Sequence, residues 1–371
     1  MASNLRVSSE EKNMLEQMIS ILESKGEYCF KKEINGINYD VQIVLPGKDE
    51  KVNIPYILAI PANINSNSRL AVESNNCDFD GNKMPDANTL LLKNALDTAR
   101  QLSNVIQSNE TPILIPILPP SIPSETSSFL YFQQLADECF RLNENNPFYR
   151  LDLQVEKVIE EAKERILSMT GVTIDDKIFL NGYSSSGVFA QRFALIHPEL
   201  IDTLCVGGAS GSIPFPEQEE EIEKHFSFNY PLGTRNYKEL FGKTFDEEEY
   251  KRIKFRYYVG ELEEERKTNE RVDDLGNPAP MHDMSYFVAS VPSAVGKCQR
   301  NVFGTSLIER ATNQTKILNN LGYDISHTVI KGRGHSDVPE LGIIGVKEQG
   351  DKFISNTFSE SANKSESLSN I

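Results

Sequence analysis

The sequence is short of positive charge. Lys and Arg number 38 against 54 Asp and Glu, which gives a formal net charge of −16 at pH 7. A surface of this sign repels the phosphates of nucleic acids and the anionic headgroups of membranes. We therefore expect neither a nucleic-acid partner nor a membrane partner.

Long hydrophobic runs and paired cysteine motifs are also absent. No apolar stretch reaches the length of a transmembrane helix, and the polar start MASNLRVSSEEKNMLEQ lacks the apolar core of a signal peptide. The five cysteines lie far apart without CxxC or Cys/His spacing, so they indicate neither a disulfide framework nor a zinc site. We expect a cytoplasmic protein that requires no metal and no organic cofactor.

Several kinds of segment follow one another along the chain. Residues 1–30 predict an amphipathic N-terminal helix, and the alternating stretches EYCFKKEI and INYDVQIVLP, joined by Asn-Gly, predict a β-hairpin. Short, uniformly apolar runs then alternate with helical patterns, which is typical of parallel strands covered on both faces. The runs are YILAIP (56–61), PILIPIL (112–118), KIFLNG (177–182), TLCVGG (203–208), FRYYVG (255–260) and HTVIKG (327–332).

This alternation predicts one doubly wound α/β domain over residues 31–350, with a mostly parallel sheet behind the N-terminal hairpin. The acidic stretch 214–252 is longer than a simple crossover, and we interpret it as a cap insertion over the carboxyl edge of the sheet. Residues 351–371 are Ser-rich and aperiodic, which predicts a disordered tail.

The stretch KIFLNGYSSSGVFAQRFALIHP carries the strongest chemical signal. An apolar strand that ends in Gly-x-Ser and runs straight into a helix is the nucleophile-elbow pattern, which lifts a serine hydroxyl above a sharp turn. The residues two before and two after the nucleophile must be small, and Ser184 meets this requirement with Gly182 and Ser186. The neighbouring serines would place a tyrosine or a valine in the turn. The alternative is that all three serines only cap the helix.

The same turn would aim the backbone N–H of Ser185 at a substrate oxygen, at the positive end of the helix. A second oxyanion donor is expected from the loop after YILAIP. There Ala62 or Asn63 could donate a backbone N–H, and Asn63 also its side-chain amide. The loop has no glycine, so it is not the glycine-rich oxyanion loop of lipases. An Asn/Ser-rich surface turn is the alternative.

A serine hydroxyl needs a base, and the sequence holds five histidines. His335 follows the last apolar run through two glycines, in KGRGHSD, so its loop can reach across the carboxyl edge of the sheet towards Ser184. The order serine first and histidine last is also that of an α/β-hydrolase. The other four have surface or structural interpretations: His197, His225, His282 and His327.

A carboxylate just past the strand FRYYVG should orient the histidine and stabilise its charged form. The segment GELEEERKTNERVDD offers several carboxylates. A residue three positions after the strand-ending glycine commonly reaches the histidine, which selects Glu263. Glu261, Glu270 and Asp273 stay as alternatives.

With these residues in place, the chain resembles the α/β-hydrolase superfamily, and more narrowly bacterial members whose elbow reads glycine, aromatic, serine, small, serine, glycine. GYSSSGVFAQRFALIHPEL fits that pattern, and the resemblance covers roughly residues 38–345. Broader relatives include esterases and polyhydroxybutyrate depolymerases. The resemblance implies Ser184 as nucleophile and His335 as base. The family's acid loop usually reads glycine, glutamate, any residue, aspartate, whereas here Glu263 stands in the last place.

The sequence therefore predicts a serine hydrolase that cleaves a small-molecule carboxylic ester through an acyl-enzyme. A serine peptidase or amidase would use the same groups, and a binding protein could retain the fold without turnover. The natural substrate and the oligomeric state stay open.

Overall fold

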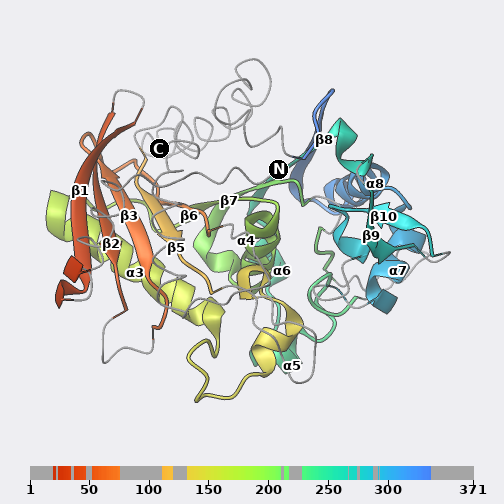
Figure 1. Ribbon diagram of the computed structural model, residues 1–371, viewed down its shortest axis with the longest axis horizontal. Helices are drawn as coiled ribbons and strands as arrows, with labels where there is room; N and C mark the ends of the chain where they lie inside the picture. Colours follow the sequence, from red (N-terminus) through yellow and green to blue (C-terminus); the bar gives the residue numbers. More distant parts are fainter. Residues whose placement is uncertain are drawn as a thin grey trace.

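Within the residues that the structure describes, a nine-stranded sheet has the order β1-β2-β3-β5-β4-β6-β7-β8-β11 (Figure 1). The computed structural model describes residues 20–335 except for 22–23, 35–36, 47–51, 76–110, 120–131, 210–212, 217–227, 266, 274–275, 287–290 and 292. The strands of the sheet are β1 (Glu27–Ile34), β2 (Ile37–Val44), β3 (Tyr56–Pro61), β4 (Ala71–Val72), β5 (Ile113–Pro116), β6 (Ile178–Tyr183), β7 (Ile201–Gly207), β8 (Lys254–Gly260) and β11 (Asp324–Ile330).

The sheet is antiparallel at its N-terminal side and parallel elsewhere. β1 pairs with β2, β2 with β3 and β3 with β5 in antiparallel fashion, whereas β5, β4, β6, β7, β8 and β11 all run in one direction. The predicted hairpin and the mostly parallel α/β sheet are both confirmed. Of the helix predicted over 1–30, residues 1–19 lie outside the described residues. Residues 27–30 belong to β1 instead, because their backbone pairs with β2.

Helices cover one face of this sheet and flank its end. α3 (Leu151–Thr170) contacts β3 and β5, and α4 (Ser185–Ile196) contacts β6 and β7.

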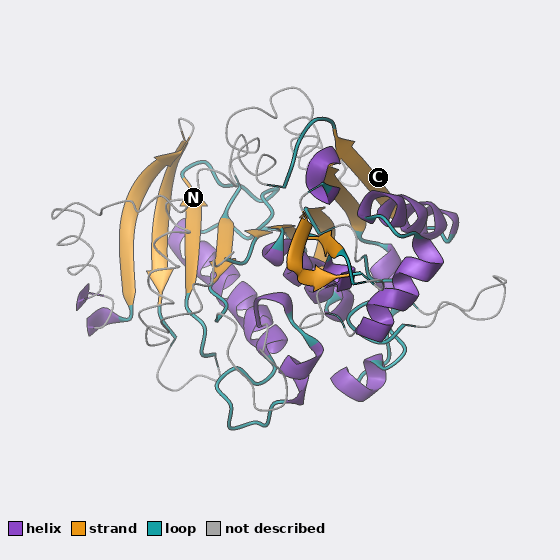
Figure 2. Ribbon diagram, turned by 45° about the vertical axis from the view of Figure 1, so that its right-hand side comes forward, coloured by secondary structure: helices purple, strands orange, loops and turns teal. Residues whose placement is uncertain are grey.

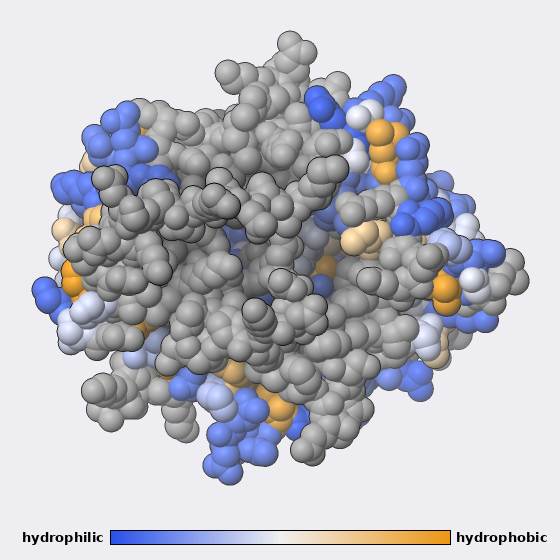
Figure 3. Space-filling view, in the orientation of Figure 1, coloured by the Kyte–Doolittle hydropathy of each residue, from blue (hydrophilic) through white to orange (hydrophobic). Residues whose placement is uncertain are grey.

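Among the described helices none is both long and apolar enough to cross a membrane. The described residues visible in Figure 3 are mainly hydrophilic. The other helices are α5 (Tyr237–Phe241), α6 (Glu247–Lys251), α7 (Ser293–Phe303), α8 (Leu307–Asn320) and the 3-10 turns η1 (Phe132–Gln134), η2 (Asp137–Arg141), η3 (Pro198–Leu200), η5 (Glu261–Glu264) and η6 (Met284–Tyr286).

Burial on both faces explains why the strands are uniformly apolar. In β3, Tyr56, Leu58 and Ile60 pack in the larger core cluster, which includes side chains of α3 and α4. Ile57 and Ala59 point the other way and belong to a second cluster on the opposite face. A strand with no solvent-exposed face has no polar alternation, so YILAIP forms one continuous apolar run.

The segment 214–252 contributes to the core where the structure describes it. Phe228, Tyr230 and Tyr237 are almost fully buried, and the Tyr237 hydroxyl donates to the carbonyl of Ile196 at 2.9 Å. This contact lies at the end of α4 farthest from the elbow. Aromatic side chains of residues 228–252 thus pack inward, and the cap interpretation of 214–252 stays a prediction. Residues 217–227 and the predicted tail 351–371 lie outside the described residues.

The chain segment that follows β8 and precedes β11 in the sequence forms a separate group of elements, at the right of Figure 1. It consists of the hairpin of β9 (Lys267–Val272) and β10 (Pro278–Pro280), followed by η6, α7 and α8 (Figure 2). α7 packs closely on η6, since a Cβ atom at Gly296 would lie 2.1 Å from the carbonyl oxygen of Ser285. The chain of these elements leaves the sheet just after the predicted acid loop and returns just before the strand that leads to His335.

Candidate active site

The turn between β6 and α4 holds Ser184 in a strained backbone conformation. β6 ends at Tyr183 and α4 begins at Ser185, so Ser184 alone occupies the bend, with φ 56° and ψ −116°. A positive φ at a non-glycine residue costs on the order of 1–3 kcal/mol. The bend is also crowded: a Cβ atom at Gly182 would lie 2.3 Å from the carbonyl oxygen of Ser186. A small residue at position 182 is therefore a steric necessity of this turn.

The structure brings Ser184, His335 and Glu263 together. His335 Nε2 lies 2.9 Å from Ser184 Oγ, and His335 Nδ1 lies 2.8 Å from Glu263 Oε2. An ionised carboxylate only accepts hydrogen bonds, so Nδ1 carries the proton and Nε2 of the neutral imidazole accepts from the serine hydroxyl. Such an arrangement can take up the serine proton while the carboxylate stabilises the resulting imidazolium.

The carboxylate of Glu263 is buried and held at both oxygens. Its side chain has no exposed surface. Oε1 accepts from the backbone N–H of Gly260 at 2.9 Å, and the Tyr183 hydroxyl oxygen lies 3.4 Å from it, while Oε2 faces His335. A buried carboxylate is costly unless it is hydrogen-bonded, and these partners meet that need. The 3-10 turn directly after β8 sets this geometry, because it brings the third residue after Gly260 back to the strand end.

The alternative acids have other partners. Glu261 is exposed and accepts from the backbone N–H of Gly332 at 2.8 Å. Asp273 accepts from the backbone N–H of Asn277 at 2.8 Å in the turn between β9 and β10. The side chain of Glu270 lies outside the described part of the chain.

Contacts between two loops keep the acid and the imidazole in register. The N–H of Leu262 donates to the carbonyl of Arg333 at 2.9 Å. A Cβ atom at Gly260 would lie 2.3 Å from that same oxygen, so the loops touch backbone to backbone. β8 and β11 are parallel neighbours and end at the same edge of the sheet, which is why residues more than 70 positions apart in the sequence meet here.

The other four histidines differ in their surroundings. His197 is buried at the end of α4, with Nε2 at 3.1 Å from Asp152. His327 lies on β11, where burial lowers its pKa to about 4. His225 lies outside the described residues. His282, however, stacks on the ring of His335, with the centroids 3.6 Å apart and the planes 7° apart. Its surface interpretation is therefore wrong, and nothing in APMHDM distinguishes it from a loop histidine.

The N–H of Ser185 is the first backbone N–H of α4, so no carbonyl of a preceding helical turn accepts a hydrogen bond from it. It lies next to Ser184 at the positive end of the helix, where an anionic oxygen is favoured. The Ser185 hydroxyl has a separate partner, since it accepts from Gln134 Nε2 at 3.2 Å. The Ser185 backbone N–H is therefore a donor that the bend places directly beside Ser184.

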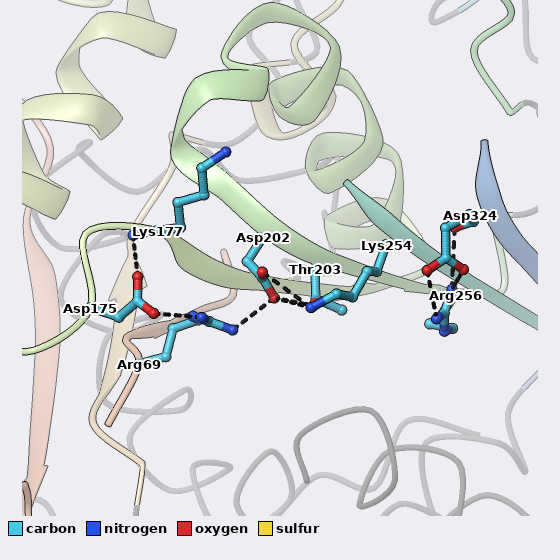
Figure 4. Close-up of polar contacts among 8 residues, drawn as sticks. All are labelled: Arg69, Asp175, Lys177, Asp202, Thr203, Lys254, Arg256 and Asp324. Carbon is cyan, nitrogen blue, oxygen red and sulfur yellow. Dashed lines mark hydrogen bonds and ion pairs between the residues drawn. The ribbon is translucent and has the colours of Figure 1, made fainter. Parts of the chain in front are cut away.

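The structure does not bring Asn63 to this site. β3 runs antiparallel to β5, so the loop after it emerges at the sheet edge opposite Ser184. Arg69 of that loop pairs with Asp175 and Asp202 at 2.5 and 2.7 Å (Figure 4). These two acids stand at the beginnings of β6 and β7, whereas the elbow stands at the end of β6. The prediction of Asn63 as an oxyanion donor is therefore wrong.

The two-residue strand β4 takes the place that the sequence interpretation assigned to β3. It pairs in parallel with both β5 and β6, so the residues after it run alongside the elbow. Ser74 and Asn75 in this stretch are buried, and the Ser74 hydroxyl has no hydrogen-bond partner among the described residues. A strand of two residues has no periodicity, so the sequence offered no signal for it.

A carboxylic acid also lies beneath the elbow. Oε2 of Glu73, the residue after β4, accepts from Asn181 Nδ2 at 2.8 Å. Burial raises the pKa of Glu73 to about 7, against the opposing effect of hydrogen bonds from Asn181 and Ser186. Ser186 Oγ in turn accepts from the backbone N–H of Tyr183 at 2.8 Å. Glu73 is thus linked through one side chain to the backbone that bends at the serine.

The raised pKa of Glu73 predicts a pH-dependent stability. The ordinary pKa of 4.5 applies in the unfolded chain, so between pH 4.5 and about 7 the folded state binds a proton that the unfolded state releases. This contribution is present at low pH and is lost as the pH rises through 7. We expect Glu73→Gln to stabilise the protein at pH 8 by about 1–3 kcal/mol, and by less at pH 5. Thermal melts at both pH values measure this.

The control for that prediction is Glu248→Gln, which removes a carboxylate whose side chain is 83% exposed. It should change the melting temperature little at either pH. An equal effect of Glu73→Gln at pH 5 and pH 8, or a loss of stability at pH 8, would contradict the prediction.

The sheet order and the position of the serine decide the architecture. The N-terminal strands of the sheet are antiparallel, and the later strands are parallel. β5 lies between β3 and β4 in the sheet, so the chain crosses from β4 to β5 and then returns past β4 to β6. The bend after β6 carries Ser184. This is the α/β-hydrolase fold. The turn that carries Ser184, the loop after β8 that carries Glu263 and the loop after β11 that carries His335 all lie at its carboxyl edge.

No model of a known protein family matches the sequence, and no curated protein matches it. Similar solved structures include a thermostable esterase at 14% identity and a TM-score of 0.36, with 82% of this chain and 55% of that chain covered. Carboxyl esterase 2 from the mycorrhizal fungus Tuber melanosporum has 9% identity and a TM-score of 0.44, with 90% and 88% covered. An S-formylglutathione hydrolase from Agrobacterium tumefaciens has 13% identity and a TM-score of 0.39, with 90% and 98% covered.

Proposed function

We propose that the protein is a serine hydrolase that cleaves carboxylic esters of small molecules through an acyl-enzyme. The observation that carries this proposal is the continuous hydrogen-bonded series from Ser184 Oγ through His335 to Glu263, at 2.9 and 2.8 Å. The strained φ of 56° at Ser184 supports it, because stored backbone strain clusters at functional sites.

In the proposed reaction Ser184 Oγ attacks the ester carbonyl carbon while its proton passes to His335 Nε2. The tetrahedral oxyanion accepts from the N–H of Ser185 and from a second donor, which we place in the stretch after β4 in place of Asn63. Each such donor is worth about 10²–10³ in rate. His335 then protonates the leaving alcohol oxygen. It next deprotonates a water that attacks the acyl-enzyme, and Ser184 regains its proton as the carboxylic acid leaves.

Hydrolysis of p-nitrophenyl acetate and butyrate, compared with aminoacyl p-nitroanilides, tests this proposal. We expect turnover of the esters and much slower cleavage of the anilides. Faster cleavage of the anilides would indicate a peptidase. No turnover of any ester, together with no covalent reaction at the serine, would indicate a binding protein with a hydrolase fold.

Gly208 provides a steric test of the site. It follows β7 with φ +62°, and a Cβ atom there would lie 2.8 Å from His335 Cε1 and 2.9 Å from Tyr183 Cζ. We expect Gly208→Ala to displace the imidazole and to lower kcat/KM for p-nitrophenyl acetate by about 100-fold or more, because misplacement by about 1 Å has effects of this size.

Gly242→Ala is the matched control, since Gly242 also has a positive φ, +69°, but nothing lies within 4 Å of an added Cβ atom. Both variants carry the backbone strain, whereas only Gly208→Ala meets the imidazole. Equal activity of the two variants would contradict the placement of His335.

A further inference from the structure

A second imidazole covers the ring of His335. The rings of His282 and His335 lie parallel, with centroids 3.6 Å apart and planes 7° apart. The ring of Tyr183 lies 5.0 Å from that of His335 at 41°, and its hydroxyl donates to the His335 carbonyl at 2.7 Å. Parallel contact at this distance leaves little freedom for the His335 ring to rotate out of its plane. The ring orientation that serves both Ser184 and Glu263 is therefore fixed by packing as well as by hydrogen bonds.

The loop that carries His282 is anchored in the protein interior. Asp283 and Arg310 form an ion pair at 2.6 Å, and neither side chain has exposed surface. Asp283 Oδ1 also accepts from the N–H of Ser285 at 2.9 Å, and Arg300 donates to the Ser285 carbonyl at 2.6 Å. These arginines belong to α7 and α8, so the elements between β8 and β11 present His282 on a rigid support.

We propose that His282 is a positioning residue for the base: its ring holds His335 in the orientation that serves Ser184, and only its neutral form permits His335 to become charged. This inference rests on the proposed function. During the reaction His335 becomes an imidazolium, and a protonated His282 would place a like charge 3.6 Å away.

The charged and titratable groups around the pair come from several elements. Glu263 on η5 faces His335 Nδ1, and Tyr183 on β6 contacts the His335 ring. Asp283 adjoins His282 in the chain and is paired with Arg310 of α8. Glu263 is hydrogen-bonded to His335, and Asp283 is paired with Arg310. The proposed pH effect therefore depends on the charge of His282.

The experiment is the pH dependence of kcat and kcat/KM for p-nitrophenyl acetate in the wild type, His282→Phe and His282→Ala. Phenylalanine keeps a flat ring without a titrating group, and alanine removes both. At pH 8 we expect His282→Ala to lose about tenfold in kcat with a smaller change in KM, and His282→Phe to stay within about threefold of the wild type. On the acid side the wild type should lose activity with a slope of one but at a higher pH than His282→Phe, because protonation of either imidazole of the pair stops the reaction, whereas the variant has only His335 to protonate.

An unchanged kcat in His282→Ala, or an acid limb at the same pH in His282→Phe as in the wild type, would overturn the inference. Should His282→Ala fail to fold, as judged by its thermal melt, the acid limb of His282→Phe still decides. Failure of the proposed function gives a different result, because the wild type itself would then show no turnover and no covalent reaction with a fluorophosphonate.

Discussion

Ser184→Ala is expected to lower kcat for p-nitrophenyl esters by about 10⁴- to 10⁶-fold while the protein stays folded. Ser184 is the serine of the turn whose hydroxyl reaches the imidazole, at 2.9 Å from His335 Nε2. The hydroxyl of Ser185 accepts from Gln134, and that of Ser186 is bonded to the backbone of Tyr183. Neither neighbour can replace the lost nucleophile without a change in the bend. Initial rates with each ester measure the loss.

Ser185→Ala is the matched control for that prediction. It removes a hydroxyl from the next residue but keeps the backbone N–H that we assign to the oxyanion. We expect its kcat to stay within about tenfold of the wild type, since no proposed step uses the side chain. A large loss in Ser185→Ala with activity retained in Ser184→Ala would move the nucleophile by one residue and contradict the elbow assignment.

Glu263→Gln is expected to lower kcat by about 10²- to 10⁴-fold. The carboxylate accepts from His335 Nδ1 at 2.8 Å and thereby selects the tautomer whose Nε2 can accept the serine proton. Glutamine fits the same space but carries no charge, so it no longer stabilises the imidazolium, and its amide N–H₂ favours the opposite tautomer. The loss should appear in kcat, because the side chain acts on the charged state formed during the reaction.

Glu261→Gln tests whether position 263 is special among the acids of this loop. Glu261 is exposed and bonds the backbone of Gly332, so its amide variant should keep activity within about threefold. Activity lost in Glu261→Gln and retained in Glu263→Gln would assign the acid role to the other glutamate. Thermal melts of both variants separate loss of activity from loss of fold.

The parts of the fold that local sequence dictates could be predicted. The hairpin follows from alternation across Asn-Gly, and the buried strands follow from their apolar runs. The elbow could be predicted from a steric rule that involves only five residues. Position 182 must hold a small residue, because the chain folds back onto the carbonyl of Ser186. His335 and Glu263 could be selected because both stand just past parallel strands, and such strands end at one edge.

The features that depend on strand order could not be predicted in this way. Asn63 was the wrong oxyanion candidate because an apolar run does not reveal its direction, and β3 proved antiparallel to its neighbour β5. The strand whose following residues run alongside the elbow is β4, and it has only two residues. His282 reaches His335 only through the packing of α7 and α8, which hold Asp283 beside it by long-range contacts.

Reaction with a fluorophosphonate, followed by peptide mass spectrometry, tests the central claim most directly. The wild type should take up one phosphonyl group per chain, and that group should map to Ser184. The modification should disappear in Ser184→Ala and persist in Ser185→Ala. An unmodified wild type, or a phosphonyl group on any residue other than Ser184, would contradict the account.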